Sequence, residues 1–241
     1  RRLMQKPIRD VALTICKRTP RYIKNKFLIR DLEKNNLHWK TLIPAEFYET
    51  TKSCFYNDSF FFETNNSTLR SKFRTLFDYQ SIIHRSDEIL KNKMLIFKKN
   101  VSYISNKPNW HYSIDKNSTW PIIDVNKINY HDYKNYGDPR YTWELNRFLH
   151  LADLGRAYWL TLDEKYSERV CSEIKSWINS NPYMYGINWM EGIEVGLRSI
   201  NWIFAYQFVS RSESFKSIEN IFLESLYLHG HYIFENLSDK W

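Results

Sequence analysis

The feature that most constrains the fold is the helical spacing of apolar residues through roughly the last hundred residues of the chain. Apolar side chains recur every three or four positions there, and the connections between the periodic segments are short. The pattern predicts four consecutive helices, at about 141–160, 164–179, 190–209 and 213–237. Asp163 is placed to cap the second helix, and Asn181-Pro182 to end it. Because short connections make neighbouring helices antiparallel, we expect a series of helical hairpins. Such a series suits an α/α toroid better than a four-helix bundle, but periodicity alone does not separate the two architectures.

Composition favours a helical, aromatic-rich core. The 241 residues include only 6 Gly and 7 Pro, but 9 Trp, 17 Tyr and 15 Phe. Few turn-forming residues and many large ones disfavour an all-β sandwich. Exposed aromatic rings could also stack on flat ligands such as sugar rings, although for any single ring burial in the core is the simpler interpretation.

The N-terminal half is less regular. Residues 1–70 form a poorly assigned segment, which we expect to pack on a helical domain formed by residues 71–241. A helical pattern covers 71–93, and 94–103 is typical of one or two short strands. The polar, aromatic stretch 106–140 predicts a long ordered loop over the surface, a kind of segment that often carries function.

The charge of the chain suggests a polyanionic partner. Its 35 Lys and Arg against 27 Asp and Glu give a formal net charge of +8, which could steer nucleic acid, anionic lipid or acidic polysaccharide. No nucleic-acid-binding motif, phosphate-binding glycine loop or GxSxG motif occurs. No apolar run is long enough to cross a membrane, and the basic start of the chain does not predict a signal peptide.

No cofactor or metal site is expected. The three cysteines, Cys16, Cys54 and Cys171, have no metal-ligand spacing and imply no disulfide framework. His229 and His231 lie two residues apart on a predicted helix, so they do not share a face that one metal ion could use.

Two polar stripes on the predicted helices are candidates for ligand binding. The first follows i, i+3, i+4 and i+7 spacing and comprises Trp143, Asn146, Arg147 and His150. An aromatic ring, an amide and a guanidinium on one face can stack on a sugar and bind its hydroxyls and carboxylate. A solvated stripe in which Arg147 pairs with Glu144 is an equally open interpretation.

The second stripe follows i, i+3, i+7 and i+10 spacing and comprises Glu191, Glu194, Arg198 and Asn201. Glu194 and Arg198 have the spacing and order of a favourable i, i+4 ion pair. Asn188 and Trp189 lie where the preceding connection enters the helix, and backbone N–H groups there are exposed to an anion. An ordinary helix salt bridge with an Asn cap is the alternative.

Several motifs in order resemble the N-terminal helical domain of the heparinase II/III-like family of polysaccharide lyases. They are WELNR at 143–147, T-x-D-E-K-Y at 161–166, W-I-x-x-N-P at 177–182 and N-W-x-x-x-x-E-V-x-x-R at 188–198. Trp120, Asp124 and the segment LYLHGHYIFENL also fit, so the resemblance covers about residues 75–237. It implies a mainly α fold, an incomplete α/α toroid, with a few short strands in the N-terminal half.

The resemblance also implies an activity and a location. Full-length relatives carry a C-terminal antiparallel β-sandwich domain, absent from this chain, and cleave uronic-acid polysaccharides such as heparan sulfate or alginate by β-elimination. The family is exported, which implies a periplasmic or secreted protein. The groups that neutralise the uronate carboxylate and move the C5 proton follow the LYLHGHYIFENL segment, so we expect the catalytic residues beyond Trp241 and little activity from this chain alone. The residues then expected to line the substrate cleft are Trp143, Asn146, Arg147, Asn188, Trp189, Glu194 and Arg198.

Two other functions remain open from the residues themselves. One is a glycoside hydrolase on a similar toroid, for which Glu144, Glu191 and Glu194 are the candidate carboxylates. The other is a non-catalytic protein that binds or assembles an acidic polysaccharide.

Overall fold

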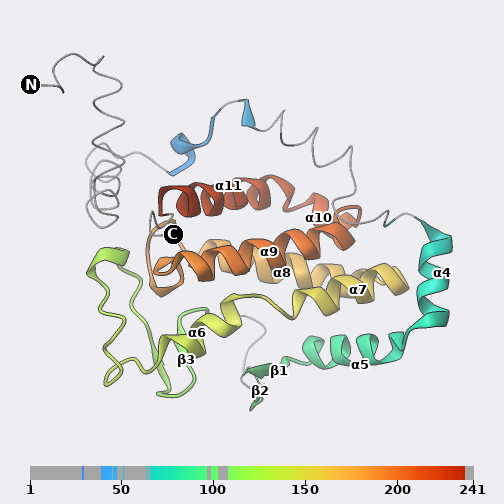
Figure 1. Cartoon of the computed structure of the whole chain (residues 1–241), viewed down its shortest axis with the longest axis horizontal. Helices are drawn as coiled ribbons and strands as arrows, with labels where there is room; N and C mark the ends of the chain where they lie inside the picture. The colour runs from blue at the N-terminus through green and yellow to red at the C-terminus, as the bar shows by residue number, and fades with distance from the viewer. Residues whose placement is uncertain are drawn as a thin grey trace, which may run out of the picture.

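Over the residues that the structure describes, the protein is mainly helical, with two antiparallel pairs of short strands (Figure 1). The computed structural model describes residues 29, 39–44, 46–47, 51, 64, 66–96, 99–102 and 108–236. The α-helices are α4 Ser67–Leu76, α5 Tyr79–Leu90, α6 Pro139–Asn146, α7 Leu151–Thr161, α8 Glu164–Ser180, α9 Gly192–Val209, α10 Glu213–Lys216 and α11 Glu219–Glu235. Short 3₁₀ helices are η1 Trp39–Leu42, η2 Val125–Lys127 and η3 Ile187–Trp189.

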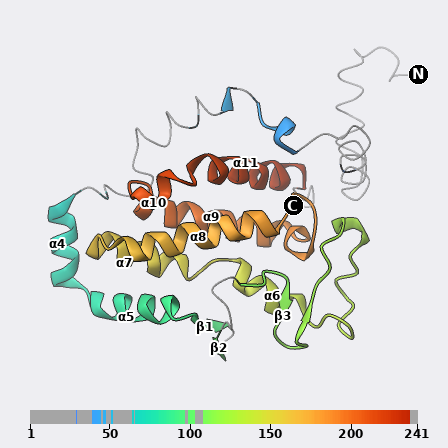
Figure 2. The ribbon, with the colours of Figure 1, turned by 180° about the vertical axis from the view of Figure 1, so that it is seen from behind.

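Helices α7, α8, α9 and α11 lie side by side and run in alternating directions along the chain (Figures 1 and 2). α9 lies toward the viewer in Figure 1 and α8 in Figure 2, and α7 and α11 each contact both of them. The antiparallel arrangement predicted from the short connections is therefore confirmed. Indole rings fill the space between these helices, and Trp177 and Trp202 meet edge to face with their centroids 5.4 Å apart.

Helix α8 shows why the local sequence signals worked here. The Asp163 side chain accepts a hydrogen bond from the backbone N–H of Lys165, which satisfies one of the free donors at the helix start. Leu162 adopts a left-handed conformation, with φ of 60°, and this ends α7 just before the new helix. At the other end, α8 stops at Ser180, directly before Asn181-Pro182, as predicted.

The single helix predicted for 141–160 is wrong, because the chain forms two helices there. α6 begins at Pro139 behind the Asp138 cap and ends at Asn146, and α7 begins only at Leu151. Between them Phe148 has a left-handed φ of 59° and a fully buried ring, which packs against Trp110 at 4.9 Å. The helix is interrupted where this ring is buried, so tertiary packing overrides the local helical pattern.

Two further predicted helices are also divided. The pattern at 71–93 forms α4 and α5, with Asp78 capping α5. The segment 213–237 forms the short α10 and then α11. The expectation of short strands at 94–103 is confirmed by the antiparallel pair β1 Lys93–Ile96 and β2 Lys99–Ser102.

The long loop expected at 106–140 is ordered over the part described, from residue 108. It contains the small hairpin β3 Tyr112–Ser113 and β4 Ser118–Thr119. An isolated antiparallel bridge joins Asp124 to Tyr185, in the connection between α8 and η3. Most of the segment 1–70 lies outside the described residues. In the described part, Lys40 forms an ion pair with Glu224 of α11, with the Nζ and Oε2 atoms 3.0 Å apart.

Candidate functional site

The residues predicted to line the cleft gather at one end of the helical array. The C-terminal ends of α8 and α11, the start of α9, helix α6 and the long loop all lie at this end, on the left in Figure 1 and on the right in Figure 2. The two polar stripes, separate in the sequence, come together there, because each contributes side chains to one hydrogen-bond network.

Two amides connect the stripes. The Nδ2 atoms of Asn146 and Asn188 both donate to the backbone carbonyl of Trp110, each at 2.9 Å. The Oδ1 atom of Asn146 accepts from the indole N–H of Trp177 at 2.7 Å. Asn188 also donates to Oδ1 of Asn181 at 2.9 Å. Both amides are buried, so they hold the long loop, α6 and the α8–α9 connection together from inside.

Arg198 lies in a buried aromatic cage. Its guanidinium stacks over Trp177, with the Cζ atom 4.1 Å from the ring centroid, and over Trp189 at 5.4 Å. Nε donates to Nε2 of His229 at 2.7 Å, and Nη2 donates to the carbonyl of Asn188 at 3.1 Å. Burial lowers the pKa of Arg198 to about 9, which still leaves the guanidinium charged near neutral pH.

Arg147 lies at the edge of the network and pairs with two carboxylates. Its Nε and Nη2 atoms donate to the two oxygens of Glu194, each at 2.7 Å, and Nη1 donates to Glu144 at 2.5 Å. The hydrogen bond to Glu194 is the main reason why the pKa of Arg147 is raised. The Arg147 side chain is 23% exposed, against 7% for that of Glu194.

The expected i, i+4 pair of Glu194 and Arg198 is wrong. Glu194 turns to Arg147, across the contact between α9 and α6, whereas Arg198 turns to α11. The alternative pairing of Arg147 with Glu144 does form, but beside the stronger bidentate pair. Asn201, also in the second stripe, donates to the Arg147 carbonyl at 2.8 Å and so holds the α6–α7 corner.

The two predicted tryptophans are buried as well. Trp143 donates its indole N–H to the carbonyl of Ile187 at 3.0 Å and belongs to a small second core with Trp120 and Ile128. Trp189 is 1% exposed. Six of the seven predicted cleft residues are thus buried and hold the scaffold together. Arg147 has the most accessible side chain of the seven. Contact of any of them with a substrate stays a prediction.

His150 does not share a helix face with Trp143, Asn146 and Arg147, because α6 ends before it. Its Nε2 atom lies 2.5 Å from Glu173, a buried carboxylate that also accepts from Arg169 at 2.5 Å. Burial by itself would raise the pKa of Glu173, but His150 and Arg169 hold that pKa below its ordinary value. The cluster joins α8 to the α6–α7 corner.

Sequence reasoning missed three members of the network. The Trp110 carbonyl carries no sequence signal, because a backbone acceptor is the same in every residue. Trp177 and His229 lie inside two of the motifs that carry the family resemblance. The motifs mark these two positions but do not show that their side chains bind Asn146 and Arg198. His229 and His231 do face different neighbours, as their spacing predicted: Tyr183 lies 2.8 Å from His231 Nδ1.

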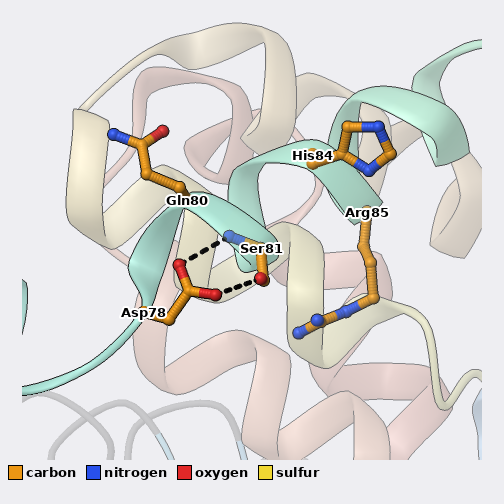
Figure 3. A pocket seen from close by; sticks show the side chains of 5 residues that line it. All are labelled: Asp78, Gln80, Ser81, His84 and Arg85. Carbon is orange, nitrogen blue, oxygen red and sulfur yellow. Dashed lines mark hydrogen bonds between the residues drawn. The ribbon is translucent and has the colours of Figure 1, made fainter.

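A shallow polar pocket lies at the other end of the array, at the start of α5 (Figure 3). Its lining residues are Asp78, Gln80, Ser81, His84 and Arg85. Asp78 is used as the helix cap for Ser81, and Arg85 forms a bidentate pair with Asp153 at 2.9 and 3.2 Å. None of the predicted cleft residues contributes to this pocket.

The ranges that the structure describes contain no group of three or more His, Cys, Asp or Glu side chains placed to hold a metal ion. Among these residues no helix is both long and apolar enough to span a bilayer.

The fold and the network together define a helical domain whose aromatic core is cross-linked by buried amides and a buried guanidinium at one end. The chain belongs to the family described as Heparinase II/III N-terminus, whose profile matches residues 35–240 and confirms the resemblance. That membership implies a polysaccharide lyase family. No curated protein and no solved structure matches the chain.

Proposed function

We propose that the chain is the substrate-cleft domain of a lyase that cleaves a uronic-acid polysaccharide, of the heparan sulfate or alginate kind, by β-elimination. The family match over residues 35–240 carries this proposal. The helical hairpins are in keeping with an incomplete α/α toroid, which we propose as the architecture of the domain. We further propose a periplasmic or secreted location and a C-terminal β-sandwich domain as partner, both from the family resemblance.

The charge of the chain supports an acidic substrate. A net charge of +8 raises the local concentration of a polyanion and speeds its encounter with the domain. The site itself carries no excess positive charge at Arg147, because this guanidinium pairs with the carboxylates of Glu144 and Glu194. A uronate carboxylate would therefore bind Arg147 by replacing Glu144, the more exposed of the two partners, while Glu194 keeps the guanidinium oriented.

We assign a different role to the buried members of the network. Asn146, Asn188 and Arg198 keep the α8–α9 connection and the long loop in one arrangement, and a rigid cleft wall loses less entropy when a sugar chain binds. The groups that move the C5 proton are proposed to lie beyond residue 241, as the resemblance implies.

The product of the reaction tests the proposal. The chain, and a longer protein that continues into the C-terminal β domain, are incubated with heparan sulfate, alginate and a neutral glucan. We expect far-ultraviolet absorbance from unsaturated uronate with the longer protein and an acidic substrate, and little or none with residues 1–241. Proton transfer alone contributes about 10²–10⁴-fold to such reactions.

Other outcomes would support other functions. Reducing ends without unsaturated uronate would identify a hydrolase, and binding of the longer protein without turnover would identify a binding or assembly protein. Strong elimination by residues 1–241 alone would mean that the proton-transferring groups lie within this chain, and Tyr136, His150, His229 and His231 would be the first to test.

A further inference from the structure

The part of the long loop from 129 to 136 presents aromatic and basic side chains to solvent in a fixed arrangement. Tyr133 is 49% exposed, although it is a large aromatic residue, and the neighbouring His131 and Lys134 are exposed as well. Neither the helical core nor the network around Arg147 uses these three side chains. A single exposed apolar residue on a protein surface needs no functional explanation. Neighbouring rings exposed on one ordered loop indicate a surface that could bind a ligand.

The rings are held against one another. The centroids of Tyr130 and His131 lie 4.0 Å apart, and the ring of His131 meets that of Tyr133 at right angles with centroids 5.9 Å apart. Nδ1 of His131 lies 3.1 Å from the Tyr133 hydroxyl, within hydrogen-bond distance. The three rings are thus in contact with one another, and we call them the loop platform.

The backbone beneath the platform is turned and hydrogen-bonded. The side chain of Asn129 accepts from the backbone N–H of His131 at 3.2 Å, and the side chain of Asp132 accepts from the N–H of Asn135 at 3.3 Å. The N–H of Tyr136 donates to the carbonyl of Asp132 at 3.0 Å. These bonds pre-order the segment, so a ligand would not have to order it on binding.

The platform is anchored to the candidate site. Tyr130 and Tyr136 pack against the small second core, which contains Trp143 and Ile187. Tyr136 also stacks on Trp120 with centroids 4.9 Å apart. Trp143 belongs to α6, the helix that Arg147 caps at its C-terminus, so the loop platform is anchored at the end of the molecule where the hydrogen-bond network lies.

Lys134 places a cation beside the exposed rings. Within the described residues, Lys134 forms no ion pair. Of the neighbouring carboxylates, Asp138 pairs with Arg140, whereas Asp132 accepts from the neutral amide of Asn135 at 2.9 Å and keeps its charge. The Lys134 ammonium is therefore exposed and unpaired, so an anionic group could bind it without displacing an ion-pair partner.

We propose that the loop platform is a binding subsite for an acidic sugar residue, with the sugar stacked on Tyr133 and its carboxylate or sulfate paired with Lys134. Rings present the apolar face that a pyranose needs, and the free ammonium supplies the charge that distinguishes a uronate from a neutral sugar. The subsite deepens the proposed function and rests on it, because it assumes an acidic polysaccharide that passes along this end of the domain.

Binding measurements on the full chain test the subsite. Short oligosaccharides of heparan sulfate and of alginate, and a neutral cello-oligosaccharide, are titrated against wild type, Tyr133→Ala, Tyr133→Phe and Lys134→Gln. We expect Tyr133→Ala to weaken binding of an acidic oligosaccharide roughly five- to tenfold, and Tyr133→Phe to retain most of it, because the ring and not the hydroxyl makes the contact. Lys134→Gln should weaken binding roughly two- to fivefold and reduce its salt dependence.

Matched controls lie at the other end of the array. Lys72→Gln on α4 removes the same charge, and Phe77→Ala removes an exposed ring; both should leave the affinity unchanged. Thermal unfolding of each variant checks that it still folds.

The outcomes separate the two proposals. Acidic binding that survives Tyr133→Ala would overturn the subsite and leave the proposed function intact. Equal binding of neutral and acidic oligosaccharides, weakened by Tyr133→Ala, would support a sugar platform but contradict the acidic substrate. No binding of any oligosaccharide by the wild-type chain would overturn both.

Discussion

Nε of Arg198 donates a hydrogen bond to Nε2 of His229 across the contact between α9 and α11, at 2.7 Å. Because Nε2 accepts, the proton of the neutral ring lies on Nδ1, which donates to the carbonyl of Ser225 at 2.6 Å. Both side chains are fully buried among Trp177, Trp189 and Trp202. One cation and one neutral ring thus join two helices that the sequence alone leaves unconnected.

The first prediction concerns pH. Burial, reinforced by the charge of Arg198, holds the pKa of His229 well below its ordinary value of 6.5. The unfolded chain therefore binds a proton that the folded chain excludes, and the free energy of unfolding falls as pH drops below about 6.5, by up to about 1.4 kcal/mol per pH unit for this ring. His229→Gln should lose that part of the slope in urea unfolding measured between pH 7 and pH 5.

The burial of His111 and His231 also lowers the pKa of each ring. Their contributions are present in wild type and in His229→Gln, so the difference between the two slopes isolates His229. His84→Gln, on the exposed side of α5, is the matched control. An unchanged slope in His229→Gln would show that the ring is not held neutral.

The second prediction separates scaffold from ligand contact at Arg198. Arg198→Ala leaves the Asn188 carbonyl and His229 without their donor and opens space between the indoles, so we expect a loss of about 3 kcal/mol or more in the free energy of unfolding. Chemical unfolding followed by circular dichroism measures this loss. If Arg198→Ala weakens glycan binding but leaves stability unchanged, Arg198 is a ligand contact and not a part of the scaffold.

The third prediction concerns Glu144. Glu144→Gln removes one of the two carboxylates on Arg147 and leaves the bidentate pair with Glu194 in place. We expect acidic oligosaccharides to bind roughly two- to fivefold more tightly, as for a partly exposed charge, and neutral ones to bind as before. Calorimetric titration measures the affinity of each variant for the acidic and for the neutral oligosaccharides. Glu213→Gln, which removes a carboxylate from an exposed pair with Lys216, is the control; a gain of the same size there would reflect net charge and not the site.

The fourth prediction concerns the corner between α6 and α7. Phe148→Ala should lose about 3–5 kcal/mol of stability, because its ring is fully buried. Phe148→Gly should be more stable than Phe148→Ala by about 1 kcal/mol, although Gly normally destabilises, because the left-handed φ of 59° penalises a Cβ atom. Thermal and urea unfolding compare the two variants. The reverse order would indicate that the corner relaxes to an ordinary conformation once the ring is gone.

Much of the secondary structure followed from local sequence signals. Apolar spacing, the Asp163 cap and the Asn181-Pro182 stop predicted α8 almost to the residue, because caps and breakers act within one turn of the chain. The order of the quoted motifs also identified the family, since matching several separated motifs needs no knowledge of contacts.

The breaks and the pairings were decided by tertiary structure. The chain leaves the helix at Phe148 because a buried ring stabilises the corner by more than continued helical hydrogen bonds would. Glu194 had a possible partner four residues away in Arg198, but each side chain pairs outside α9. Glu194 accepts from both Nε and Nη2 of Arg147 at the end of α6, and Arg198 donates to His229 on α11. Spacing along one helix shows which side chains can meet, whereas the neighbouring helices determine which pairs are buried together, and burial is what gives a charged or polar contact most of its strength.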